Sequence, residues 1–142
     1  MSAFADTSFI GSLYLADANS EKANAGFADL VRPVLISSLG ELELINALQL
    51  YVFRKEILEG VFRAAVASFR SDVASGVIEV KPISDAVYAK AMQLSTLWTA
   101  KFGTPSLDIL QVASAIVLEV DTFMTFDDRQ KRLAEAAGLA CR

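Results

Sequence analysis

Ser2-Ala-Phe-Ala-Asp6-Thr7-Ser8 decides the fold class, because a short apolar run ends in an acid and the apolar stretch 9–15 follows at once. This order predicts a strand, a polar turn and a short helix. Asp121-Thr-Phe-Met-Thr-Phe126 also reads as a strand, and Asp127-Asp128 begin a predicted helix directly after it. The chain therefore places an acid immediately after two of its predicted strands.

Strands and helices alternate between these two segments. The other predicted helices cover about residues 18–30, 39–54, 56–74, 85–102 and 105–120, and the other predicted strands cover residues 34–36, 77–81 and 138–141. Ser38 and Glu41 match a capping box, Ser84 fits a helix cap, and Pro105 fits the first position of a helix. The alternation predicts an α/β fold, with a mainly parallel sheet covered by helices on both faces.

The composition predicts one domain over residues 1–142, in the cytoplasm. Apolar residues make up 54% of the chain and charged residues 21%, which leaves apolar surface for a partner. Acidic or basic residues interrupt every apolar run before it reaches the length of a membrane span, and the start of the chain does not resemble a secretory signal. The single cysteine, Cys141, excludes an internal disulfide and fits a reducing compartment.

The absence of histidine narrows the chemistry open to this chain. It excludes Ser-His-Asp and Cys-His catalysis and every histidine metal site. With 13 basic and 17 acidic residues the net charge is −4, which argues against a surface coated with basic residues for non-specific nucleic-acid binding. Carboxylates remain as the chief means of catalysis.

Four acids stand out by their positions. Asp6 and Asp127 follow strands, where parallel α/β sheets carry their sites, although an acid there also serves as a helix cap. Asp108 lies in the first turns of a helix that reads as buried, so its charge requires a partner or a metal. Glu43 lies among leucines with no visible structural role, although a solvated position also accounts for it. If the four converge they require a cation, and hard divalent ions prefer oxygen ligands.

These residues resemble the motifs of PIN-domain nucleases, in the expected order over the whole chain. Asp6-Thr7-Ser8 is similar to the first motif and Ser38-Leu-x-x-x-Glu43-x-x-Asn46-Ala47-Leu48 to the second. Leu107-Asp108-Ile-Leu-x-Val-Ala113 is similar to the third, and Phe123-x-Thr125-Phe-Asp127-x-Arg129-Gln130 to the fourth. Length and arrangement are most similar to the VapC-type toxins of bacterial toxin–antitoxin pairs.

The resemblance implies a PIN-like three-layer α/β/α sandwich with a sheet of four or five short strands. It implies that Asp6, Glu43, Asp108 and Asp127 bind one or two Mg²⁺ or Mn²⁺ ions for hydrolysis of RNA phosphodiester bonds. Thr7, Ser8 and Thr125 are expected to orient these carboxylates or metal-bound water, although such hydroxyls also cap backbones. Expected partners are the RNA substrate, a small antitoxin protein and a second copy of the chain, through helices at about residues 18–30 and 54–74.

The sequence departs from the close subgroup beside the third acid. That subgroup usually has an arginine shortly before the acid and a histidine three residues after it, whereas this chain has Pro105-Ser106 and Gln111. Substrate choice is therefore open, and a catalytically weak PIN-like module that binds RNA or a partner stays an alternative. A haloacid-dehalogenase-type phosphatase is disfavoured by Ser8 where a second Asp is needed, and a receiver module by the lack of an Asp in residues 77–81.

Basic residues that could contact RNA phosphates occur in two stretches, although exposed charges also serve solubility. They are Arg54, Lys55, Arg63 and Arg70 on the middle helices, and Arg129, Lys131 and Arg132 after the fourth acid.

Overall fold

A parallel sheet of five short strands forms the centre of the molecule in the computed structural model, which describes residues 2–142. The strands are β1 (Ala3–Ala5), β2 (Val34–Ser37), β3 (Ile78–Lys81), β4 (Thr122–Met124) and β5 (Ala140–Cys141). Their order across the sheet is β3-β2-β1-β4-β5, so β1 and β4 are neighbours. Asp6 follows β1 directly, and Asp127 follows the end of β4 by three residues. The predicted parallel sheet is confirmed.

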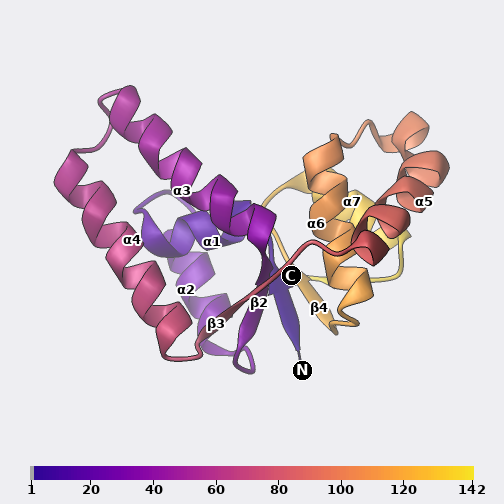
Figure 1. The fold of residues 1–142 in the computed structure, drawn as a ribbon, viewed down its shortest axis with the longest axis horizontal. Helices are drawn as coiled ribbons and strands as arrows, with labels where there is room; N and C mark the ends of the chain where they lie inside the picture. The colour runs from indigo at the N-terminus through magenta and orange to yellow at the C-terminus, as the bar shows by residue number, and fades with distance from the viewer. Residues whose placement is uncertain (1) are drawn as a thin grey trace.

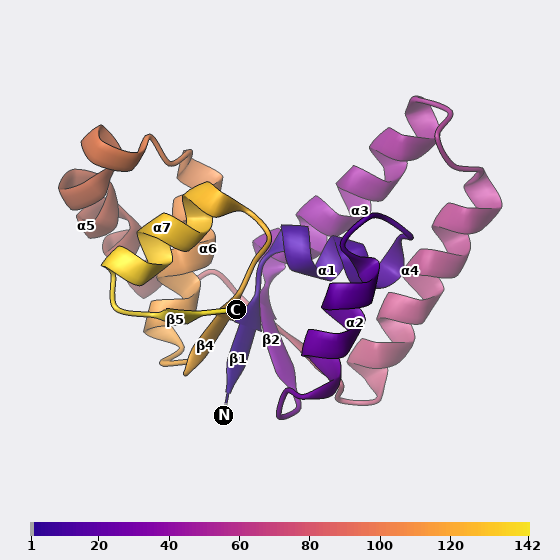
Figure 2. The ribbon, with the colours of Figure 1, turned by 180° about the vertical axis from the view of Figure 1, so that it is seen from behind.

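Helices cover both faces of this sheet, as the two opposite views in Figure 1 and Figure 2 show. One face carries α1 (Thr7–Tyr14), α2 (Ser20–Ala28), α3 (Ser38–Phe53) and α4 (Glu59–Ala74), and the other carries α5 (Asp85–Phe102), α6 (Ser106–Val117) and α7 (Asp128–Ala136). The expected three-layer α/β/α sandwich is confirmed. None of the helices within residues 2–142 combines the length and apolar content that crossing a membrane requires.

The sheet separates two hydrophobic cores, because successive side chains of a strand point to opposite faces. In β1, Ala3 and Ala5 pack in the core beneath α1–α4, whereas Phe4 packs in the core beneath α5–α7. The ring of Phe4 stacks on that of Phe123 in β4, with centroids 5.8 Å apart. The small residues of β1 thus face the core beneath α1–α4, and its one large residue faces the core beneath α5–α7.

The predicted capping box is wrong by one residue. The N-cap of α3 is Ser37, whose side chain accepts a hydrogen bond from the backbone N–H of Gly40. Ser38 is the first helical residue, and Glu41 accepts instead from Arg70 on α4 at 2.6 Å. Both serines can cap a helix, and pairing of β2 with β3 as far as Ser37 decides which of them does.

Three further helix starts differ from the prediction, and one of them is α2, which begins at Ser20 and not at about residue 18. Pro105 is the N-cap of α6, so the helix begins at Ser106, and α4 begins at Glu59, three residues after the predicted start. Ser84 and Asp127 act as the predicted caps, since their side chains accept from backbone N–H groups of α5 and α7. Local signals thus locate every helix, and their first residues shift where a neighbouring strand or loop intervenes.

Candidate active site

The acids after β1 and β4 lie at the same edge of the sheet, because the two strands are parallel and in register. The backbone N–H of Asp6 donates to the carbonyl oxygen of Met124 at 3.1 Å, which extends the pairing to the last residues of both strands. Asp6 is the N-cap of α1 and Asp127 is the N-cap of α7. Capping and a functional role, which the sequence left as alternatives, are therefore compatible for both acids.

Asp6 is fully buried, and its carboxylate accepts three hydrogen bonds. Its Oδ1 accepts from the Ser8 hydroxyl at 2.7 Å and from the backbone N–H of Phe9 at 3.0 Å. Its Oδ2 accepts from the hydroxyl of Thr125, which follows β4. Burial raises the pKa of Asp6 from 3.8 to about 6, while these donors oppose the increase and Asp127 adds to it. The carboxylate is thus held rigidly at a cost in solvation.

Glu43 lies on α3, one turn into the helix, and faces α1 and α6. Its Oε1 accepts from the Thr7 hydroxyl at 2.9 Å and from the Gln111 side-chain amide at 2.8 Å. The neighbouring acid, Glu41, points instead to Arg70 on the surface. Of the two glutamates in this part of α3, only Glu43 takes part in the acid cluster.

Gln111 connects the acid cluster to the start of α3. It is fully buried, and its Oε1 accepts from the Ser37 hydroxyl at 3.0 Å while its Nε2 donates to Glu43 and to Thr7. A Cβ atom at Gly40 would lie 3.4 Å from that Nε2, so the helix approaches Gln111 closely at this point. Sequence reasoning treated Gln111 only as a departure from a motif. The only feature of the sequence that indicates this role of Gln111 is that a neutral polar residue lies on the buried face of an apolar helix.

Asp108 is half-buried in the first turn of α6, and its Oδ1 accepts from the Gln130 amide at 3.1 Å. Its pKa is raised chiefly by burial, and then by the negative charges of Asp127 and Glu43, while Arg129 and the bond from Gln130 oppose the increase. The repulsion from two acids on other elements shows that the carboxylates share one electrostatic environment. The Oε1 atom of Gln130 is buried with no hydrogen-bond partner among the described residues.

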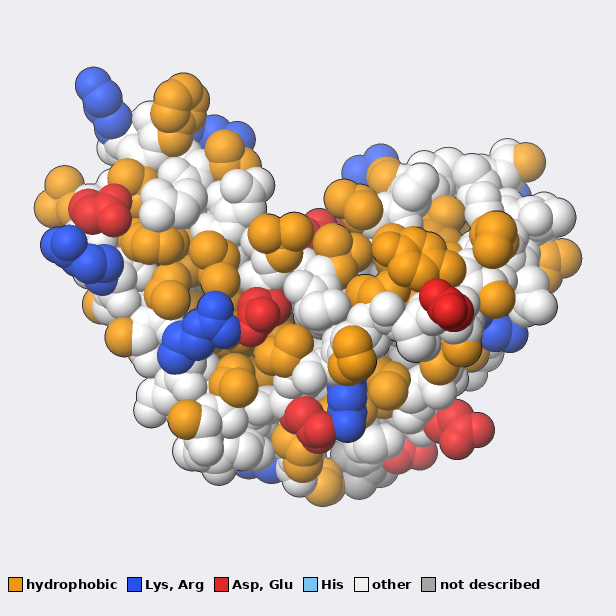
Figure 3. Space-filling view, in the orientation of Figure 1, with side chains coloured by type: hydrophobic (Ala, Val, Ile, Leu, Met, Phe, Trp, Pro, Cys, Tyr) orange, Lys and Arg blue, Asp and Glu red, His pale blue; other side chains and the backbone are white. Residues whose placement is uncertain are grey.

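The four acids therefore gather at one edge of the sheet, where Figure 3 shows a hollow between the α3–α4 arm and the α5–α7 side. Within residues 2–142, no three acid or thiol side chains are close enough to form a metal site as they stand. Hydroxyl, amide and backbone donors engage the carboxylate oxygens instead. The donor set fits a hard divalent cation by its chemistry, since it consists of carboxylate oxygens whose mutual repulsion a cation relieves.

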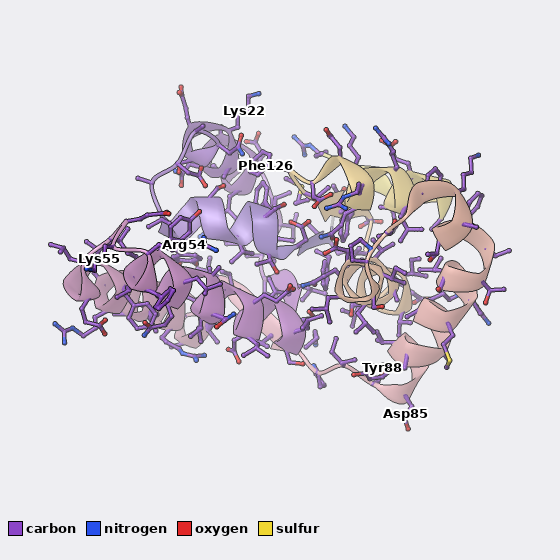
Figure 4. The ribbon with its side chains drawn as sticks, turned by 90° about the horizontal axis from the view of Figure 1, so that it is seen from above. Lys22, Arg54, Lys55, Asp85, Tyr88 and Phe126 are labelled. Carbon is purple, nitrogen blue, oxygen red and sulfur yellow. The ribbon has the colours of Figure 1, made fainter. Side chains whose placement is uncertain are left out.

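The predicted supporting hydroxyls contact the acids, whereas the predicted basic residues are spread over several parts of the molecule. Thr7 bonds to Glu43, and Ser8 and Thr125 bond to Asp6. Arg129 is the basic residue whose charge acts on Asp108, whereas Arg70 pairs with Glu41. Arg54 and Lys55, both labelled in Figure 4, follow the last residue of α3, at the opposite end of the helix from Ser38.

Comparison with known proteins adds to this geometry. The PIN-domain family model matches residues 3–136, nearly the whole chain. The chain belongs to the PIN-domain family. No curated protein matches the chain significantly by comparison of sequences.

Several solved structures share the fold of this chain. The Mycobacterium tuberculosis toxin VapC20, described as cleaving the sarcin–ricin loop, has a TM-score of 0.72 at 22% identity, with 98% of this chain and 97% of that chain covered. VapBC2 from Rickettsia felis, bound to a promoter DNA fragment, has a TM-score of 0.69 at 17% identity, with 100% and 98% covered. FitAcB from Neisseria gonorrhoeae has a TM-score of 0.69 at 18% identity, with 98% and 95% covered. At these identities the likeness establishes the fold.

Proposed function

We propose that this PIN domain is a metal-dependent endoribonuclease that hydrolyses RNA phosphodiester bonds and acts as the toxin of a type II toxin–antitoxin pair. The observation that carries the proposal is that four acids lie at one edge of the sheet and act on one another. Burial is the main cause of the raised pKa of Asp6 and of Asp108, the charge of Asp127 adds to both, and Glu43 adds to that of Asp108. Such an arrangement is unfavourable without a cation. Membership of the PIN family and the toxin structures that share its fold support the assignment.

Asp6, Glu43, Asp108 and Asp127 would hold Mg²⁺ or Mn²⁺. When bound there, such an ion would supply a water of lowered pKa and would neutralise charge that develops on the phosphate. Ser8 and Thr125 keep the Asp6 carboxylate oriented, and Thr7 and Gln111 do the same for Glu43. Arg129, next to Asp108, is positioned to contact a substrate phosphate.

The partners follow from the same comparison. A structure from Klebsiella pneumoniae is described as a toxin–antitoxin complex, and VapC20 is described as a toxin. A small antitoxin protein is therefore the proposed partner of this chain. A homodimer through α2 and α4 is also proposed. The most exposed apolar side chains are Leu58 at the N-cap of α4, Phe53 at the adjoining end of α3, and Met92 and Leu97 on α5. Sedimentation velocity at micromolar concentration tests the dimer, and a monomer alone would contradict it.

Isosteric variants test the proposed activity. Asp6→Asn, Glu43→Gln, Asp108→Asn and Asp127→Asn should each abolish Mg²⁺-dependent RNA cleavage while the circular dichroism spectrum persists, because each removes a ligand charge with little change in volume. Sequencing the ends of the cleaved RNA would identify the cutting site. If the wild-type chain binds RNA without cleaving it under any divalent cation, the RNA-binding alternative replaces the enzyme.

A further inference from the structure

A pocket of about 410 Å³ lies beside the acid cluster, between α1 and α3. Thr7, Ser8 and Asp127 line the pocket and also belong to the cluster or its supporting hydrogen bonds. A group bound in the pocket would therefore lie directly next to the proposed cleavage site. The volume is within the range of sites for small molecules and cofactors.

The walls of the pocket favour a flat, uncharged ring. Leu44 and Leu48 of α3 line it, and the rings of Tyr51 and Phe126 contribute aromatic surface. Phe126 is held by stacking on Phe9, with ring centroids 5.4 Å apart. Aromatic side chains are the usual platforms on which proteins stack the bases of single-stranded nucleic acid.

The charge of the lining excludes a phosphate as the occupant. Asp17 and Asp127 are the charged residues of the wall, and the described residues that line it include no lysine or arginine. Lys22 of α2 and Arg54, the C-cap of α3, are labelled in Figure 4, and neither is among the residues that line the pocket. This distribution suits a nucleotide whose base enters the pocket while its phosphates remain outside.

Asp17 supplies a fixed hydrogen-bond acceptor at the polar end of the pocket. Its Oδ2 accepts from the Ser12 hydroxyl at 2.8 Å, and its Oδ1 accepts from the backbone N–H of Asn19 at 2.8 Å. These bonds hold the carboxylate in one orientation while leaving it exposed. A carboxylate and the Asn19 carboxamide together can pair with the N–H groups and acceptors on the edge of a base.

We propose that this pocket binds one base of the RNA, in the nucleotide adjacent to the phosphodiester that is cleaved. The proposal rests on the ribonuclease function and extends it to recognition of the substrate. Tyr51 and Phe126 stack on the base, and Asp17 accepts from its edge. The pocket thereby sets which phosphodiester reaches the acids.

Gly11 offers a way to fill the pocket without disturbing the acids. It lies in α1 and lines the pocket, and no atom lies within 4 Å of where its Cβ would be. Gly11→Leu should therefore fold, since leucine is a better helix former than glycine. Gly60→Leu is the matched control, because Gly60 is also helical with open space at its Cβ but lies in α4, outside the pocket.

The experiment measures RNA affinity and cleavage separately, using fluorescently labelled single-stranded oligonucleotides with one abasic nucleotide placed in turn around the cutting site. For wild type and Gly60→Leu, we expect an abasic nucleotide at one adjoining position to weaken binding roughly 5- to 100-fold. Gly11→Leu should weaken binding of the intact RNA by a similar factor and show no further loss with that abasic RNA. Tyr51→Ala should behave in the same way.

Other outcomes overturn one proposal or the other. Equal affinity of wild type for every abasic RNA, or unchanged affinity in Gly11→Leu, would overturn the base pocket and leave a protein segment as its occupant. A base-dependent affinity without cleavage would overturn the ribonuclease and keep the pocket. Failure of wild type to bind any RNA would overturn both.

Discussion

Asp6 and Asp108 belong to one acid cluster, yet the fold holds them in different ways. The Asp6 carboxylate is fully buried and accepts from two hydroxyls and a backbone N–H. The Asp108 carboxylate is half-buried, accepts from one side-chain amide and faces the charges of Asp127 and Glu43. Burial is the largest cause of the raised pKa of both acids. Hydrogen-bond donors then oppose the increase in pKa mainly at Asp6, whereas repulsion from other acids adds to the increase mainly at Asp108.

The cluster therefore has a fixed part, Asp6 and Glu43, which hydrogen bonds hold in place, and a repelled part, Asp108, which is exposed to the charges of other acids. Asp6 and Glu43 are held by residues of α1, α6 and β4's end, so their positions depend on protein contacts. Asp108 is repelled by neighbouring carboxylates, and a bound divalent cation would offset this repulsion. We therefore expect changes at Asp6 to alter the stability of the protein itself, and changes at Asp108 to alter its response to metal.

The largest expected effect is the pH dependence at Asp6. Because its pKa is raised from 3.8 to about 6, the neutral acid contributes stability below about pH 4 that is lost as the pH rises through 6. The loss amounts to roughly 3 kcal/mol. The Asp6→Asn side chain cannot ionise, so the variant should not lose this stability. Urea denaturation in chelator should therefore show the free energy of unfolding of the variant rising relative to that of wild type between pH 4 and 7. A difference independent of pH would contradict the buried, ionising Asp6.

Gln111 contacts Glu43 and Gln130 contacts Asp108, so alanine variants of the two glutamines compare how strongly each side of the cluster is held. Gln111→Ala removes a buried side chain with three partners and should lower the free energy of unfolding by about 2–3 kcal/mol. Gln130→Ala removes one bond to a half-buried acid and should cost about 1 kcal/mol. Urea denaturation at neutral pH measures both. Equal losses would show that the two sides of the cluster are held alike.

Asp108→Asn tests the repelled part. With a dissociation constant of order 1 mM and about 10 mM Mg²⁺, one site adds roughly 1.4 kcal/mol, or about 4–6 °C in melting temperature. The variant should be more stable than wild type in chelator and should lose the Mg²⁺ shift. Thermal melts at matched ionic strength measure both effects. An unchanged Mg²⁺ shift would remove Asp108 from the proposed site.

The smallest expected effect is at Glu41, whose ion pair with Arg70 is largely exposed. Glu41→Gln should change stability by at most about 1 kcal/mol and leave RNA cleavage intact, whereas Glu43→Gln should abolish it. Parallel cleavage assays compare the two variants. If Glu41 proves essential and Glu43 dispensable, the second acidic motif is assigned to the wrong residue.

The sequence by itself determined the layers of the fold and the edge at which Asp6 and Asp127 meet. Both acids follow short apolar runs, and parallel strands bring their carboxyl ends to one edge of a sheet. The caps at Ser84 and Asp127 were also predictable, because a capping bond joins residues only two or three positions apart. Because these interactions join residues close together in the chain, the amino-acid sequence alone is enough to predict them.

Only the tertiary structure decided how the acids are held. Gln111 contacts Glu43 and Ser37, which lie 68 and 74 residues away in the chain, and Thr125 contacts Asp6 across 119 residues. The choice of Ser37 over Ser38 as the cap likewise depended on where β2 stops pairing with β3. A hydrogen bond between distant side chains depends on the packing of the elements that carry them. The local pattern of polar and apolar residues does not specify that packing.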